Sequence, residues 1–274
     1  MKADMKSSHL QRWLTSIVAI PVLLYLILFG PRVLFYSLLC AVSIVGIFEF
    51  NDTTDTSFPR PLRWALPFLS IAFFAVLYYR RILIMPFMLF LFALIPLAYF
   101  MITSPSKGPK GTSEIAVALF GPVYILLPLS MLVLVDMRPD GKTWIMFLVV
   151  VMFLSDSGAF YFGRSMGRHK LYEAVSPKKT WEGAFGGLFC SLLGGLIFMR
   201  IFRPGGFDPG LFILIPLLSI AGQLGDLAES MLKRNHSKKD SGRILPGHGG
   251  VLDRIDGFLF AIPMLYIYLD LTGY

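Results

Sequence analysis

Hydrophobic residues along the chain are grouped into long runs that are separated by short polar stretches. A helix that crosses the hydrocarbon core of a bilayer needs about 20 mostly apolar residues. Runs of roughly this length cover residues 11–30, 33–50, 64–79, 82–103, 114–136, 143–163, 181–199, 209–228 and 251–272. The pattern predicts an all-α, polytopic integral membrane protein with about nine transmembrane helices.

The composition indicates that the bilayer is the solvent of this chain. Of its 274 residues, 55% are hydrophobic and 15% are charged, and the mean hydropathy of +0.68 lies outside the range of an ordinary soluble domain. Further spans follow the first run, so we expect a retained helix and not a cleaved signal peptide. Cys40 and Cys190 each lie in an apolar run, which argues against a disulfide framework or a cysteine-rich zinc site and favours core packing.

Lysine and arginine residues are distributed unevenly between the two predicted faces of the membrane. With the N-terminus in the cytoplasm, seventeen of them fall on the inner side and seven on the outer side, as the positive-inside rule requires. This topology places both long polar loops, residues 164–180 and 229–250, on the cytoplasmic face. The net charge of +8 is then explained by cytoplasmic loops near anionic lipid, and no nucleic-acid partner is expected.

The two parts of the chain differ in their polar content. Residues 1–140 hold few charges within the predicted helices, with Glu49 and Asp136 near helix ends, and are predicted to form a transmembrane scaffold. Residues 141–274 include both polar loops and hold most of the groups suited to chemistry, so they are predicted to form the catalytic region. The sequence shows no convincing internal repeat, which weakens the interpretation as an inverted-repeat transporter.

Acidic residues recur near the ends of three predicted helices. Asp253 and Asp256 are three residues apart and share one face in the first turn of the last helix. Asp226 and Glu229 lie at the end of the eighth helix, and Asp156 lies in the sixth. Carboxylates next to hydrocarbon are costly and are by default candidates for a functional site. Two carboxylates with a substrate phosphate suit Mg²⁺, although an ordinary helix cap also explains the pair in the last helix.

Basic residues and glycines surround these acids in the sequence. The bases are Lys178, Lys179, Lys233, Arg234, Lys238, Lys239, Arg243, His248 and Arg254. Such a set can be an inner-leaflet anchor, but an anchor does not need glycines at set places. Gly249 and Gly250 allow the backbone to approach a ligand, and they lead into a helix start whose amides suit anionic oxygens. Acids, bases and amides together predict a polyphosphate site.

Some residues have alternative roles that the sequence leaves open. His248 stands between glycines with little to pack against, which favours phosphate contact or proton transfer over packing. Ser230 can orient Asp226 or contact a phosphate. The seventh helix is rich in glycines, which favour close helix packing over ligand contact and also allow a homodimer. These glycines are Gly183, Gly186, Gly187, Gly194 and Gly195.

A long signature, SMLKRNHSKKDSGRILPGHGGVLDRID, runs from Ser230 to Asp256. Its elements are SxxKR, then KD, and after a spacer HGG and DRxD. The residues of the signature are Ser230, Lys233, Arg234, Lys239, Asp240, Pro246, His248, Gly249, Gly250, Asp253, Arg254 and Asp256. Upstream stand DSGAFYFGRSMGRHKL, SPKKTWEG and GDLAES. In these motifs, which cover residues 155–257, the chain resembles the phosphatidate cytidylyltransferases, also called CDP-diacylglycerol synthases.

The resemblance implies a reaction in which CTP and phosphatidic acid give CDP-diacylglycerol and pyrophosphate, with Mg²⁺ required. It implies that Asp226 and Asp253 hold the metal with Asp256 nearby, and that Lys239 and His248 take part in catalysis. The residues implied to bind or position the substrates are Asp156, Lys178, Lys179, Ser230, Lys233, Arg234, Arg243, Gly249, Gly250 and Arg254. The short chain suggests a bacterial inner membrane, with the active site facing the cytoplasm.

Three other classes of protein fit this sequence less well. A CTP-dependent lipid-alcohol kinase needs a base for a hydroxyl nucleophile, and its pattern is not recognised in this sequence. An anion transporter predicts a charged path through the membrane, whereas the acids and bases gather on one side. The DGxxAR core of CDP-alcohol phosphotransferases begins at Asp256 and Gly257, but Phe260 and Ala261 do not continue it.

Overall fold

The computed structural model describes residues 21–55, 59–103, 109–202, 208–242, 244 and 249–274. Within these residues, eight helices are long and apolar enough to cross a membrane, so the prediction of an all-α polytopic membrane protein is confirmed. The first predicted segment, residues 11–30, is represented by a helical stretch at residues 21–28, and residues 11–20 lie outside the described part. The orientation across the membrane stays a prediction.

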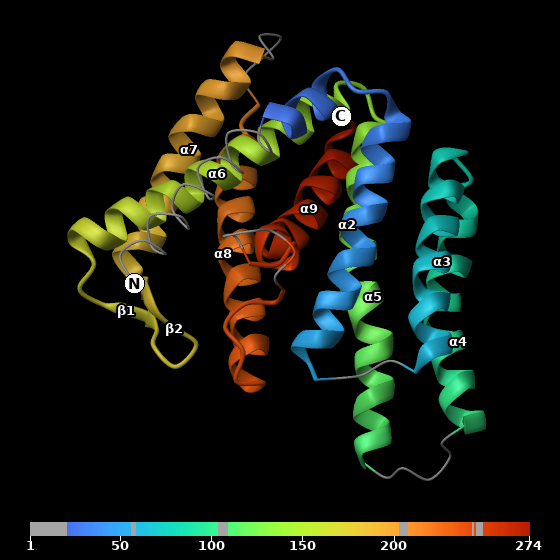
Figure 1. Ribbon diagram of the computed structural model, residues 1–274. Helices are drawn as coiled ribbons and strands as arrows, with labels where there is room; N and C mark the ends of the chain where they lie inside the picture. The colour runs from blue at the N-terminus through green and yellow to red at the C-terminus, as the bar shows by residue number, and fades with distance from the viewer. Residues whose placement is uncertain (1–20, 56–58, 104–108, 203–207, 243, 245–248) are drawn as a thin grey trace. The chain divides into compact units, whose positions relative to one another are not determined.

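The observed helices follow the apolar runs of the sequence (Figure 1). They are α2 (Arg32–Thr53), α3 (Arg60–Tyr78), the short 3-10 turn η1 (Ile82–Ile84), α4 (Met85–Thr103), α5 (Pro109–Asp136), α6 (Gly141–Met166), α7 (Trp181–Phe202), α8 (Leu211–Asn235) and α9 (Leu252–Thr272). Pro31 and Pro59 directly precede α2 and α3, where a residue without an amide proton costs a helix nothing.

The polar loop between α6 and α7 contains a small β-hairpin. Strand β1 (Lys170–Tyr172) pairs antiparallel with β2 (Ser176–Thr180), with Lys170 opposite Thr180. The Nδ1 atom of His169 lies 2.6 Å from Oε1 of Glu182, which ties the hairpin to the first turn of α7. Lys178 and Lys179 therefore lie on a hydrogen-bonded strand. This hairpin was not predicted from the sequence.

The chain divides into two compact units. The first joins Met1–Ser130 with His236–Arg254, and the second joins Met131–Asn235 with Ile255–Tyr274. Most of the signature loop thus belongs to the unit of the first helices, while α8 and most of α9 belong to the other. The predicted functional division at residue 140 stays a prediction.

The first unit has an apolar core between its helices. Leu62 of α3, Phe100 of α4 and Ala118 of α5 form a buried cluster. A Cβ atom added at Gly121 of α5 would lie 2.7 Å from Phe50 of α2. The C-terminal part of α2 is therefore packed closely against α5.

The second unit is organised by small residues between α6 and α7. Added Cβ atoms at Gly183 and Gly187 of α7 would each lie 2.7 Å from a backbone oxygen of α6, in Ala159 and Ser155 respectively. Gly194 and Gly195 likewise face side chains of the same unit. The prediction that these glycines serve helix packing is confirmed. Because they are used within one chain, they give no support to the homodimer, which stays a prediction.

Candidate active site

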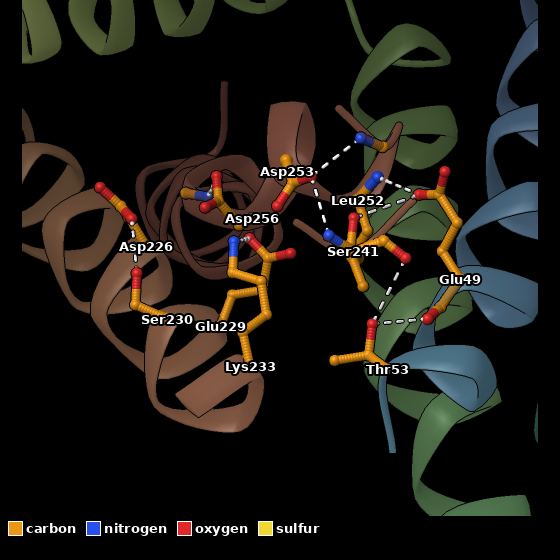
Figure 2. Close-up of polar contacts among 12 residues, drawn as sticks. Glu49, Thr53, Asp226, Glu229, Ser230, Lys233, Ser241, Leu252, Asp253 and Asp256 are labelled. Atoms are coloured by element: carbon orange, nitrogen blue, oxygen red, sulfur yellow. Dashed lines mark hydrogen bonds and ion pairs between the residues drawn. The ribbon is translucent and has the colours of Figure 1, made fainter. Parts of the chain in front are cut away.

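Helices α8 and α9 cross at glycines, and the crossing brings two of the predicted acids together. A Cβ atom added at Gly225 of α8 would lie 2.4 Å from the carbonyl oxygen of Asp256 and 3.0 Å from Cα of Gly257. The two backbones therefore touch where a larger residue does not fit. Asp226 follows Gly225 directly, and its charge acts on the carboxyl group of Asp256. Figure 2 shows both side chains beside this crossing.

Asp226 is held by two neighbours while much of its side chain stays accessible. Nζ of Lys179, in β2, lies 2.7 Å from Oδ2 of Asp226, whose side chain is 46% exposed. The hydroxyl of Ser230 donates to Oδ1 at 3.3 Å, and Lys179 also donates to the backbone oxygen of Gln223 at 3.4 Å. Of the two roles left open for Ser230, the structure shows the contact with Asp226. A carboxylate that is oriented on one side and exposed on the other can accept a further cation.

Glu229 and Lys233 form a buried ion pair within α8. Glu229 is 1% exposed and Lys233 is 9% exposed, and Oε2 of Glu229 lies 3.3 Å from Nζ of Lys233. The carboxyl group of Asp256 lies close to Glu229 and senses the charge of Lys233, and Figure 2 shows the three side chains near one another. Lys233, predicted to bind substrate, thus compensates buried carboxyl groups in this structure.

Asp253 turns back onto the loop that precedes α9. Its Oδ2 accepts hydrogen bonds from the amides of Ser241 at 3.0 Å and Gly250 at 2.8 Å (Figure 2). Gly249 adopts a φ of +82°, which favours glycine, and a Cβ atom there would lie 2.8 Å from the same oxygen. Asp253 therefore has a structural task in joining the two ends of this loop. Its predicted contact with metal stays a prediction.

Glu49, near the C-terminal end of α2, places a second carboxylate at the start of α9. Its Oε1 accepts the amide of Val251 at 3.0 Å, and its Oε2 accepts the amide of Leu252 at 2.7 Å. The hydroxyl of Ser241 donates to Oε2 at 3.4 Å, and Glu49 is only 3% exposed. The amides that the sequence predicted to suit anionic oxygens do bind them, but the oxygens belong to the protein itself.

The remainder of the signature loop is also tied to α2. Nζ of Lys238 lies 2.5 Å from Oδ1 of Asp55 and contacts the carbonyl oxygen of Asp52. Nδ1 of His236 lies 3.4 Å from Oδ2 of Asp55. The hydrogen bond from Lys238 holds the pKa of Asp55 below its ordinary value. Lys238 is therefore bound to oxygen atoms of Asp52 and Asp55 within the first unit.

Several other predicted site residues lie at the protein surface. The exposed ones are Asp156, Lys178, Arg234, Lys239 and Arg254. Arg243 and His248 lie outside the described residues, so their predicted roles stay predictions. Sequence reasoning missed Glu49 as a partner of the signature, although a carboxylate inside an apolar run is itself a signal of function.

The described residues offer a divalent cation a pair of carboxylates and not a full cage. Among them, no group of three or more His, Cys, Asp and Glu side chains is arranged to hold a metal ion. Mg²⁺ commonly takes one or two carboxylates and completes its shell with water and substrate phosphates. Asp226 and Asp256 at the helix crossing fit this requirement. Asp253 lies one turn earlier in α9.

The described residues contain eight apolar helices, with carboxylates and lysines near one helix crossing. These features define an integral membrane protein suited to phosphate chemistry. The chain matches the model of the Cytidylyltransferase family over residues 10–272 and belongs to this family. A relative named phosphatidate cytidylyltransferase from Staphylococcus epidermidis is 36% identical over 271 residues, covering 95% of this chain and 99% of the relative.

Relatives from two other species bear the same name. That from Staphylococcus saprophyticus is 38% identical and that from Staphylococcus aureus is 35% identical, each covering 94% of this chain and 98% of the relative. The family predicted from the signature is therefore confirmed. The likeness also extends over the N-terminal half, where the sequence offered no motif.

Proposed function

We propose that the chain transfers the cytidylyl group of CTP to phosphatidic acid, giving CDP-diacylglycerol and pyrophosphate. We place this reaction at the cytoplasmic side of a bacterial inner membrane. The observation that carries the proposal is the α8–α9 crossing, where Asp226 lies beside Asp256 and Lys179, in a chain whose relatives bear the name of this enzyme.

The chemistry of the two substrates fits these groups. A phosphate oxygen of phosphatidic acid attacks the α-phosphorus of CTP, and the bond from that phosphorus to the bridging oxygen breaks as pyrophosphate leaves. The attacking oxygen is already anionic, so the protein need not supply a base. The main obstacle is repulsion between two polyanions, which alignment and positive charge relieve. Exposed Lys178, Arg234, Lys239 and Arg254 are suited to supply that charge.

We further propose Mg²⁺ as the cofactor, held by Asp226 and Asp256, with Asp253 as a third candidate ligand. When bound, the ion neutralises the triphosphate and stabilises the pyrophosphate leaving group. Lys179 and Ser230 orient the carboxylate of Asp226. The buried pair of Glu229 and Lys233 lies beside Asp256 and sets the local charge.

The position of a label in CTP tests the proposal. The purified full-length chain in detergent receives phosphatidic acid, Mg²⁺ and CTP labelled at either its α- or its γ-phosphorus. Cytidylyl transfer moves the α-label into lipid and the γ-label into pyrophosphate. A lipid-alcohol kinase finds no hydroxyl acceptor in phosphatidic acid and therefore moves no α-label into lipid. A transporter moves neither, and either of these results overturns the proposal.

A second measurement tests the orientation. Sealed membrane vesicles of known sidedness receive CTP from outside, because CTP does not cross the bilayer. Inside-out vesicles are expected to form the liponucleotide, and right-side-out vesicles are expected to do so only after permeabilisation. If intact right-side-out vesicles are as active as inside-out vesicles, the active site does not face the cytoplasm.

A further inference from the structure

The last turns of α2 hold the signature loop at two adjacent points. Glu49 accepts the amides of Val251 and Leu252 and the hydroxyl of Ser241. The hydroxyl of Thr53 donates to the backbone oxygen of Glu49 at 2.7 Å and of Ser241 at 3.5 Å. The contacts with Ser241, Val251 and Leu252 link residues 188 to 203 positions apart in the sequence, all within the first unit (Figure 2).

We propose that Glu49 is a positioning residue for the reaction, which fixes the start of α9 and the adjoining signature loop. This inference rests on the proposed cytidylyl transfer. Glu49 is not proposed to touch either substrate; it acts through Ser241 and the backbone amides of Val251 and Leu252. Asp253 and Asp256 follow directly in the first turns of the helix that Glu49 caps.

The burial of Glu49 explains why its charge matters. A carboxylate that is 3% exposed is stable only where donors replace the lost water. Here two backbone amides and one hydroxyl do so, and the positive end of the α9 dipole favours the charge further. Breaking this arrangement leaves buried amides without acceptors, so the loop is expected to rearrange.

Two glycines of the loop lie so close to Glu49 that a side chain does not fit at either position. A Cβ atom added at Gly242 would lie 2.2 Å from Oε1 of Glu49, and the three nearest atoms all belong to Glu49. At Gly250 an added Cβ would lie 2.2 Å from the hydroxyl of Ser241 and 2.7 Å from Oε2 of Glu49. The need for glycine at position 242 therefore follows from the presence of Glu49, whereas at position 250 Ser241 and the backbone nitrogen of Gly242 also leave no room for a side chain.

Replacing Glu49 by glutamine tests the inference, because the amide keeps the size but has one accepting oxygen and one donating NH2 group, where the carboxylate has two accepting oxygens. We expect kcat/KM for CTP, per folded molecule, to fall about tenfold or more. Hydrogen–deuterium exchange is expected to accelerate at the amides of Val251 and Leu252. Asp52→Asn is the matched control, since Asp52 lies on the same helix and is exposed; it should change neither quantity.

A double-mutant cycle separates positioning from a general loss of stability. Gly242→Ala should impair the enzyme strongly when Glu49 is present. In the Glu49→Ala background the same change should have little further effect, because the atoms that collide with the new methyl group are gone. Gly242→Ala keeps the carboxylate, so it also serves as the test if Glu49→Gln does not fold.

Three results overturn the inference. They are an activity of Glu49→Gln within twofold of the parent, unchanged exchange at Val251 and Leu252, or equal effects of Gly242→Ala in both backgrounds. A variant that only folds less well keeps the kcat/KM of the parent per folded molecule, which is the first of these results. If the parent forms no liponucleotide, the proposed function fails, whereas the exchange data still decide the structural role of Glu49.

Discussion

The close contact between α8 and α9 at Gly225 leads to a specific prediction, because this contact determines how closely Asp226 can approach Asp256. A methyl group added at Gly225 would lie 2.4 Å from the carbonyl oxygen of Asp256 and 3.1 Å from its carbonyl carbon. These are backbone atoms of α9, so no side chain can turn away to make room. To restore an ordinary contact, the two helices must separate locally by more than half an ångström.

The size of the effect follows from this geometry. Overpacking of a close contact typically costs about 1–3 kcal/mol of stability, which a membrane protein of this size is expected to survive. Activity is more sensitive, since a displacement of about 1 Å at a reacting centre can cost roughly a hundredfold in rate. We therefore expect Gly225→Ala to fold but to lose about tenfold to a hundredfold in kcat/KM.

Gly222→Ala is the matched control, three residues earlier on the same helix. A methyl group there would lie 2.4 Å from Cε of Met152, the flexible end of a side chain that can rotate away. Liponucleotide formation by both purified variants, divided by the folded fraction from size-exclusion chromatography, measures the difference. If Gly225→Ala retains activity within about threefold of Gly222→Ala, against the expected loss, the crossing does not set the geometry of the acids.

Three further predictions concern single groups. Asp253→Asn should nearly abolish turnover but fold normally, because the asparagine oxygen can still accept the loop amides; turnover within a few-fold of the parent contradicts a role for the charge. Lys179→Ala should raise the KM for a substrate without lowering the melting temperature measurably, since a partly exposed ion pair with Asp226 contributes little; a large loss of stability contradicts this. The Lys238 hydrogen bond lowers the pKa of Asp55, so its stabilisation is present above the ordinary aspartate pKa of about 3.9 and is lost as the pH falls through the lowered pKa. The stability difference between the parent and Asp55→Asn should therefore shrink on acidification in thermal unfolding, and a difference that grows refutes the assignment.

The membrane helices could be predicted because the bilayer imposes their length and composition. The predicted segment at 143–163 corresponds to α6 (Gly141–Met166), and that at 64–79 corresponds to α3 (Arg60–Tyr78). The helices extend beyond the apolar runs where polar residues continue the backbone hydrogen bonds at the interface. The β-hairpin was not predicted, because its two strands have only three and five residues, which is too short for alternation to stand out in the sequence.

The site was predictable only in its local part. The spacing of Asp253 and Asp256 predicted that they share one face in the first turns of α9, because spacing along one helix is a property of the sequence. Asp226 was expected at the end of the eighth helix, but α8 continues to Asn235. The backbone contact at Gly225 could not be foreseen, since it depends on where α8 and α9 cross. Nor could Glu49, whose hydrogen bond to Leu252 joins residues 203 positions apart.

The start of α9 shows why a glycine-rich loop before a helix does not by itself identify a phosphate site. Glycines, exposed amides and a helix dipole favour any anionic oxygen, and a buried carboxylate from α2 meets the same requirements as a triphosphate. Because Glu49 already accepts the amides of Val251 and Leu252, these amides are not available to substrate in this arrangement. The positive charge that draws CTP and phosphatidic acid together must therefore come from lysine and arginine side chains and from the proposed Mg²⁺, and not from these two amides.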